Sequence, residues 1–364
     1  MNSKERVKNA IDHVKPDRVP LDGWFTNAVM DKLKSRFGFS DDERVLERLG
    51  IDFRPVVMEP AREFGSDAKW MDFIINKSSF SVSDYVGKPV GENVYEDEWK
   101  VQIKLNQDGA NWGYSYHPLN DLDLNKLKVP DISSPGRLDR VKERIEKFQD
   151  KFIYAGVSTS FRRGWLLTGF SKFLEALLIE RGYIDKLLER LVEFEKEEVK
   201  MYTDAGVDMI ELLGDLGSEI SLFLSPALWR EIFKPGMKAV IDSVKGKNVK
   251  FFLHTDGNIQ EIIPDLIEIG LNILNPIQPE CIDPVVIKKL FGDKLTLHGS
   301  MSLQKTFSFG KPEDVVKEAQ DRIEKCGYNG GLILAPSNAL TENIPIDNII
   351  AFYDYVRQSE SRVI

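Results

Sequence analysis

The fold is decided by the stretch VKFFLHTDGNIQEIIPDLIEIGLNILNPIQP, residues 249–279. Its two ends, 249–257 and 272–279, are short apolar runs typical of buried strands. The segment between them has the apolar spacing of a helix. Short buried strands joined by a helix are typical of a parallel α/β sheet, because parallel neighbours need a crossover connection. The stretch therefore predicts one β–α–β unit.

The same alternation continues on both sides of this unit. Further strands are predicted at 18–24, 51–59, 152–158, 208–214, 295–300 and 331–338, and most are followed by a predicted helix. Eight parallel strands with helices predict an α/β fold, the (β/α)8 TIM barrel, with a doubly wound sheet as the alternative. We expect a single domain over residues 1–364.

Residues 60–150 interrupt this rhythm. EDEWKVQIKL (96–105) and ANWGYSYHPL (110–119) flank NQDG (106–109), a pattern typical of a β-hairpin. The block lacks a continuous apolar pattern. We therefore predict a hairpin-bearing insertion near the mouth of the barrel, and not a separate domain.

The composition excludes several classes of protein. The chain of 364 residues is 42% hydrophobic and 29% charged, which is typical of a globular protein with a sizeable core. Its net charge of −9 opposes contact with phosphate backbones, so no nucleic-acid partner is expected. Neither a membrane span nor a signal peptide is expected. The two cysteines, Cys281 and Cys326, indicate a reducing, cytoplasmic setting.

The strand that ends at 254–256 carries the main candidate site. In a (β/α) barrel the functional side chains gather at the carboxyl ends of the strands. His254 and Asp256 are two residues apart, so their side chains are expected to point the same way. An imidazole and a carboxylate suit zinc or a similar divalent ion. The alternative is that Asp256 caps the next helix and His254 is a hydrogen-bonded rim residue.

Other strand ends supply further candidates. Glu211 and Asp215 could act as general acid and base or bind a metal, and the alternative is helix capping and hydrogen bonding. His298 is a candidate acid–base group, with packing before the Gly299 turn as its alternative. The predicted substrate-binding residues are strand-end groups suited to a carboxylate or a flat ligand: Trp24, Phe25, Arg162, Arg163, Glu211 and Gln278.

Several segments resemble successive parts of the uroporphyrinogen decarboxylase superfamily. ERVKNAIDHVKPDRVPLD (5–22) is similar to its opening. The segments 224–242, 251–279, 295–323 and 330–356 are similar to parts of its barrel, in the same order. The resemblance spans nearly the whole chain and implies a (β/α) barrel.

The resemblance implies one of two chemistries. The decarboxylases of haem synthesis carry an arginine-rich segment and a catalytic aspartate segment. Here DGWFTNAVMDK (22–32) has no arginine, and FRPVVMEP (53–60) has no aspartate. The other branch contains zinc-dependent methyltransferases that work with corrinoid proteins and bind zinc through a His-x-Cys motif and a distant cysteine. His254 matches that histidine, while Asp256 and Asn338 stand at the cysteine positions.

The resemblance is therefore closer to the methyltransferase-like branch. It implies an enzyme that moves a methyl group between a small methylated substrate or thiol and a corrinoid carried by a partner protein. Its metal, zinc or another divalent ion, would be held by His254, Asp256 and Asn338. A porphyrinogen decarboxylase and a non-catalytic barrel that binds a tetrapyrrole or small ligand remain alternatives. A homodimer is a further expectation.

Overall fold

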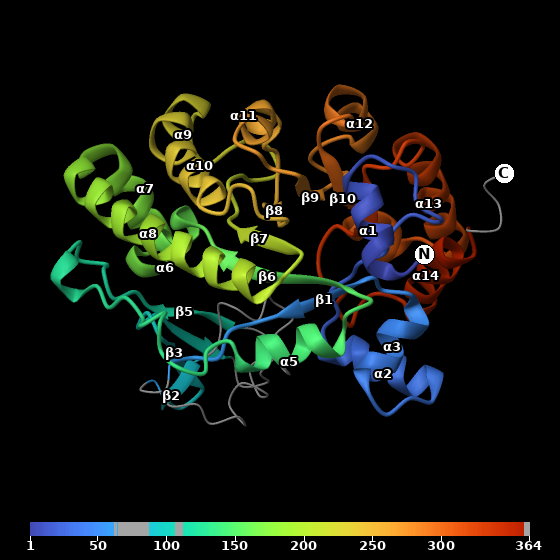
Figure 1. Cartoon of the computed structure of the whole chain (residues 1–364), viewed down its shortest axis with the longest axis horizontal. Coiled ribbons are helices and arrows are strands. Elements are labelled where there is room, and N and C mark those ends of the chain that lie inside the picture. The colour runs from blue at the N-terminus through green and yellow to red at the C-terminus, as the bar shows by residue number, and fades with distance from the viewer. Residues whose placement is uncertain (62–63, 65–86, 106–111, 360–364) are drawn as a thin grey trace.

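The computed structural model describes residues 1–61, 64, 87–105 and 112–359. Its main feature is a curled, parallel, seven-stranded sheet whose strands follow one another in chain order (Figure 1). This order has no reversal, so the doubly wound alternative is wrong. The strands are β1 (Phe53–Val56), β6 (Phe152–Ser158), β7 (Met209–Leu213), β8 (Lys250–His254), β9 (Ile273–Ile277), β10 (Thr296–Met301) and β11 (Leu332–Pro336).

Helices connect these strands and cover the outer side of the sheet (Figure 1). The first helix begins with the capping box formed by Asn2 and Glu5. The helices are α1 (Ser3–Ile11), α2 (Asn27–Phe37), α3 (Asp42–Leu49), α5 (Asp139–Lys147), α6 (Ser160–Thr168), α7 (Phe170–Ile179), α8 (Arg181–Ala205), α9 (Pro226–Ile232), α10 (Lys234–Asp242), α11 (Ile263–Glu268), α12 (Pro284–Phe291), α13 (Pro312–Cys326) and α14 (Ile346–Gln358). In the part of the chain that the structure describes, no helix is long and apolar enough to cross a membrane.

Side chains of the sheet alternate between two apolar clusters, as the pleat of a strand requires. In β6, Ile153 and Ala155 belong to the larger cluster, which also contains the helices, while Phe152 and Tyr154 belong to the smaller one. The smaller cluster joins six strands of the sheet and α1, so it fills the inside of the curl: Val7, Ile11, Phe53, Phe152, Tyr154, Met209, Phe252, Ile273 and Ile333.

The strand predicted at 18–24 is wrong. Within this segment Leu21 makes an isolated parallel bridge with Leu334, and Phe25, just after it, makes another with Leu340. Pro20 has no N–H to donate, and the N–H of Leu21 donates to the carboxylate of Asp52 at 2.9 Å. Backbone hydrogen bonds nevertheless join the segment to both sides, because Asp22 N–H donates to Leu334 O and Asp52 N–H donates to Leu21 O.

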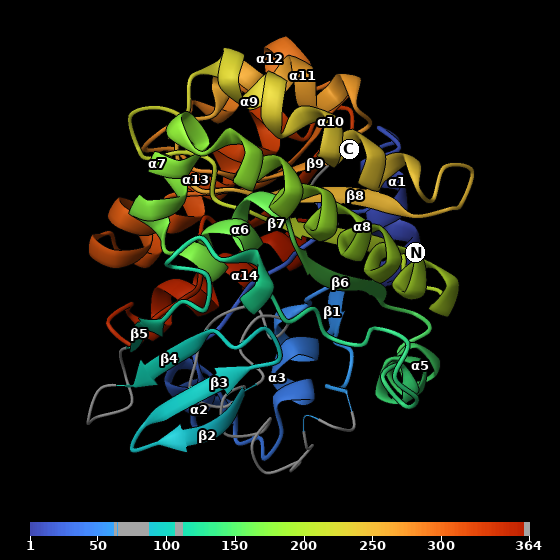
Figure 2. The ribbon, with the colours of Figure 1, turned by 90° about the vertical axis from the view of Figure 1, so that its left-hand side faces the viewer.

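A second, antiparallel sheet lies apart from the parallel one (Figure 2). Its order is β2 (Gly87–Gly91), β3 (Val94–Asp97), β4 (Gln102–Leu105) and β5 (Trp112–Tyr116). The antiparallel pairing predicted for 96–105 and 110–119 is present between β4 and β5, while the NQDG turn lies outside the described residues. Trp99 and Tyr114 join this region to α8 and α6 through ring contacts with Phe194 at 4.7 Å and Trp165 at 5.5 Å.

Candidate metal centre

Three potential metal ligands meet at the carboxyl ends of β7 and β8. Asp215, His254 and Asp256 each offer one ligand atom, and these atoms all lie within 4.8 Å of one another. His254 is the last residue of β8, so its ring stands at the rim of the sheet with 17% of its side chain exposed. Its Nε2 lies 3.8 Å from Oδ1 of Asp215, beyond hydrogen-bond reach. The site thus combines one imidazole with two carboxylates.

Backbone and amide groups hold the two carboxylates in place. The N–H of Asp256 donates to Oδ1 of Asp215 at 3.2 Å. Nδ2 of Asn338, which follows β11, donates to Oδ2 of Asp256 at 3.1 Å. Oδ1 of Asn338 accepts from the N–H of Ala339 at 2.7 Å. Asn338 therefore reaches this site as a partner of Asp256.

Neither Asp215 nor Asp256 caps the helix or turn that follows it. The turn at 260–262, which follows Asp256, has no side-chain cap, and Asn258 accepts from the N–H of Gln260 at 3.2 Å. Helix α9, the first after Asp215, is capped by Ser225. Neither Asp215 nor Asp256 is needed to begin a helix, so both carboxylates are available to the site.

A row of hydrogen bonds runs from His254 into the sheet. Nδ1 of His254 lies 2.6 Å from Oδ1 of Asn275. Nδ2 of Asn275 lies 2.7 Å from Nδ1 of His298, and Nε2 of His298 lies 3.1 Å from Oδ2 of Asp22. His298 is 1% exposed, so it lies beneath the rim.

The charged groups of the site shift one another's pKa values. Burial alone would lower the pKa of His254, but the carboxylates of Asp256, Asp215 and Glu211 outweigh it and raise that pKa. Burial raises the pKa of Asp256, with the His254 charge acting against it. Burial also raises the pKa of Glu211 to about 7, against the pull of His254 and Arg162. A carboxyl group beside the candidate ligands can therefore hold or release a proton near neutral pH.

The neighbouring arginines 162 and 163 face different surroundings. Arg162 is buried near Asp215 and Glu211, and burial lowers its pKa to about 10. The guanidinium of Arg163 lies 4.8 Å from the centre of the Trp99 ring, on the side of the antiparallel sheet. Adjacent residues of a helix point about 100° apart, which explains the divergence. The structure brings Arg162 to the site and places Arg163 elsewhere.

The aromatic candidates also separate. The Trp24 ring meets the His254 ring edge-on at 5.4 Å, and its Nε1–H donates to the Tyr154 hydroxyl at 3.3 Å. Phe25 packs against Tyr353 at 5.9 Å. Gln278 lies in the turn after β9, where its carbonyl accepts from the N–H groups of Cys281 and Ile282. Of these two aromatic residues, Trp24 is the one that contacts His254.

Sequence reasoning missed Asn275 and Tyr154. Asn275 is fully buried inside the apolar strand β9, and Tyr154 is 7% exposed inside β6. A polar side chain in an apolar strand needs a buried partner, and that was the available signal. Their partners, His254 and His298 for Asn275 and Trp24 for Tyr154, lie elsewhere in the sequence, so no local pattern identified the two residues.

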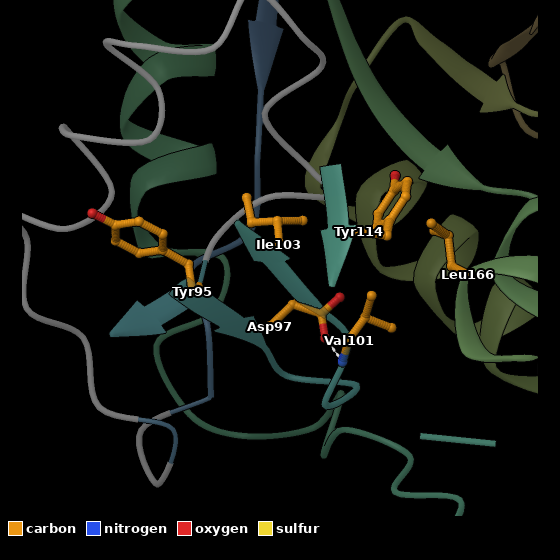
Figure 3. A pocket seen from close by; sticks show the side chains of 7 residues that line it. Tyr95, Asp97, Val101, Ile103, Tyr114 and Leu166 are labelled. Carbon is orange, nitrogen blue, oxygen red and sulfur yellow. Dashed lines mark hydrogen bonds between the residues drawn. The ribbon is translucent and has the colours of Figure 1, made fainter. Parts of the chain in front are cut away.

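Two small cavities lie beneath the antiparallel sheet. The first is about 10 Å³ and is lined by residues that include Tyr95, Asp97, Tyr114 and Leu166 (Figure 3). Asp97 accepts there from the N–H of Val101 at 2.8 Å. The second, about 40 Å³, borders Arg137, Arg163 and Glu198 among others. Cavities of this size hold water rather than a substrate.

The curled parallel sheet and the ligand cluster at its strand ends define an α/β protein with a candidate metal centre. The family model described as uroporphyrinogen decarboxylase (URO-D) matches residues 107–359. The chain therefore belongs to the URO-D family, which confirms the resemblance seen in the sequence.

One solved structure shows a similar fold over nearly the whole chain, and a second is similar more weakly. A methyltransferase from Methanosarcina mazei has a TM-score of 0.67 at 18% identity, over 98% of this chain and 99% of that chain. A B12-independent methionine synthase from Shewanella sp. W3-18-1 has a TM-score of 0.45 at 12% identity, over 96% of this chain and 97% of that chain. No curated protein matches the chain.

Proposed function

We propose that this chain is a methyltransferase that moves a methyl group between a small methylated substrate or thiol and a corrinoid held by a partner protein. The observation that carries the proposal is the convergence of Asp215, His254 and Asp256 within 4.8 Å at the strand ends. The Methanosarcina mazei methyltransferase, whose fold is similar over nearly its whole length, supports the same reading.

The donor set fits a divalent metal. One imidazole and two carboxylates are ligands that zinc and related ions accept, although cysteine thiolates are absent from the cluster of Asp215, His254 and Asp256. When bound there, such an ion would act as a Lewis acid and lower the pKa of a thiol or hydroxyl substrate.

The remaining residues have roles that follow from their positions. Trp24 would cover one side of the substrate, since its ring stands beside His254. Arg162 would bring a positive charge to an acidic site. Glu211, whose pKa is about 7, could take up the proton that a thiol loses.

Porphyrinogen decarboxylation is the second candidate, because the matching family model is described by that activity. The charges argue against it. Carboxyl groups of Glu211, Asp215 and Asp256 act on His254. Among the residues that the structure describes, Arg162 is the cation that acts on Glu211 and Asp215. A substrate with several carboxylates needs several cationic partners, because each buried unpaired carboxylate costs several kcal/mol.

We further propose that the segment 18–24 takes the eighth strand position and closes the curled sheet into a barrel. The backbone hydrogen bonds from Asp22 to Leu334 and from Asp52 to Leu21 support this. The sheet β2–β5 would then be an insertion between β1 and β6, beside the mouth.

A methyl-transfer assay tests the proposed function. The purified full chain, supplied with zinc, is mixed with methylcobalamin and a small thiol, and loss of the methyl–cobalt absorption is followed. We expect transfer by the wild type and at least a hundred-fold slower transfer by His254→Ala, with His117→Ala as the matched control. Turnover of uroporphyrinogen with no methyl transfer would favour the decarboxylase. Ligand-dependent stabilisation without either turnover would favour a non-catalytic barrel.

A further inference from the structure

The hydrogen-bonded row behind His254 crosses an irregular part of the sheet. Between β9 and β10 the register shifts, so that Asn275 and Pro276 on one strand oppose His298 alone on the other. Such bulges re-aim side chains and are frequent next to active sites. Here the bulge brings the side chains of Asn275 and His298 together at 2.7 Å.

For a neutral His298, the far end of the row fixes the direction of every hydrogen bond in it. Asp22 ends the row with a carboxylate, which accepts, so Nε2 of His298 must carry a proton and donate. Nδ1 of a neutral His298 then carries a lone pair and accepts from the amide NH2 of Asn275. The amide oxygen of Asn275 is left to face Nδ1 of His254, which must donate.

The opposite orientation of the amide is disfavoured. With Asn275 reversed, Nδ1 of a neutral His298 would carry the proton, and its Nε2 lone pair would face the Asp22 carboxylate at 3.1 Å. Two acceptors would then meet in a buried place, which costs about 1–3 kcal/mol or more. Asn275 is fully buried, while His298 and Asp22 are 1% and 4% exposed, so bulk water does not relieve the clash.

The ring of His298 is also held by packing. Phe252 meets it edge-on at 4.9 Å, Phe53 edge-on at 6.0 Å, and Trp24 stacks at 6.3 Å. A ring enclosed in this way keeps its orientation, and its burial keeps it from a substrate at the rim. His298 therefore does not fit the role of an acid–base group that touches the substrate.

We infer that Asn275, His298 and Asp22 are positioning residues that fix the Nδ1–H tautomer of His254. That tautomer leaves the lone pair on Nε2, the nitrogen that faces Asp215, free to bind a divalent cation. The inference rests on the metal centre of the proposed function. In it, the buried row of hydrogen bonds orients the His254 ring.

Zinc affinity tests this inference on the full chain. Zinc alone is titrated against a coloured chelator into the wild type, His298→Leu and His298→Asn. We expect His298→Leu to weaken zinc binding by about 10–100-fold, the usual effect of losing a partner of a histidine ligand. His298→Asn should recover much of the affinity, because its amide oxygen can accept from Asn275. His117→Leu, which removes a histidine that contacts Leu166 O, is the matched control and should bind zinc as the wild type does.

A spectroscopic readout separates positioning from folding. Nitrogen-15 spectra of histidine in the metal-free wild type at pH 8.5 should show the proton of His254 on Nδ1, and His298→Leu should show a mixture of tautomers. Zinc affinity of His298→Leu within three-fold of wild type, or a proton on Nε2 of His254 in the wild type, would overturn the positioning role alone. Failure of the wild type to bind zinc would overturn the metal centre and this inference with it.

Discussion

At the scale of single residues, burial also shifts the pKa of a carboxyl group that is not one of the candidate metal ligands. Glu195 on α8 is 3% exposed, and its Oε2 accepts from the N–H of Ser160 at 3.0 Å. Burial raises the pKa of Glu195 to about 8, with the Ser160 hydrogen bond acting in the opposite direction. The folded chain therefore holds a proton on Glu195 at pH values where the unfolded chain has lost it.

This predicts a pH-dependent stability. An acid whose pKa rises on folding stabilises the folded chain fully below its unfolded pKa of about 4.5, and this contribution is lost as the pH rises towards about 8. Glu195→Gln keeps an oxygen for Ser160 and cannot ionise. We expect its free energy of unfolding, relative to wild type, to increase by about 1–3 kcal/mol between pH 5 and pH 8.5 in urea titrations.

The control for this prediction lies on the same helix. Glu197 is exposed, so Glu197→Gln should show no such increase. A constant difference between Glu195→Gln and wild type across this pH range would contradict the buried, protonated state of Glu195.

Single residues of the candidate site were predictable only in part. The sequence predicted that His254 and Asp256 lie together, because both stand at the end of an apolar strand. In the structure Asp215 joins them from the end of the neighbouring strand. The sequence could not separate Arg162 from Arg163, because their difference is one of direction around a helix. Asn275 was missed because its two partners are on β8 and β10, which no local pattern reveals.

At the scale of elements, apolar runs predicted the seven strands of the parallel sheet and failed for 18–24. That segment is held by a buried carboxylate and by isolated backbone hydrogen bonds, without a continuous strand ladder. Asp52 is fully buried, and it accepts from Arg6 Nη1 at 2.7 Å, Arg18 Nη1 at 2.9 Å and Leu21 N–H at 2.9 Å. Such a tertiary network leaves no trace in the local hydrophobic pattern.

Removal of this carboxylate should destabilise the whole chain. Asp52→Ala leaves the buried guanidinium groups of Arg6 and Arg18 without their shared anion, which should cost about 3–5 kcal/mol. Urea unfolding measures this loss. Asp31→Ala is the matched control, because Asp31 is 71% exposed and pairs with Lys34 on the surface, where such a pair contributes about 0–1 kcal/mol. Equal effects of the two substitutions would contradict the role given to Asp52.

At the scale of the whole molecule, the neighbouring parallel strands β7 and β8 end at the same edge of the curled sheet, where Asp215, His254 and Asp256 meet. The inside of the curl contains a cluster of apolar side chains, and the candidate metal ligands lie at the strand ends above it. The match of the URO-D family over residues 107–359 agrees with a site built on this scaffold. We propose that this rim holds a divalent metal for methyl transfer.

Zinc stoichiometry and affinity test that claim most directly. Wild type, His254→Ala and Asp256→Cys are purified metal-free, loaded with zinc, and measured by elemental analysis and chelator competition. We predict one zinc per wild-type chain, none retained by His254→Ala, and binding by Asp256→Cys at least as tight as by wild type, because a thiolate is a strong zinc ligand. Absence of stoichiometric zinc from both wild type and Asp256→Cys, or its full retention by His254→Ala, would contradict the account.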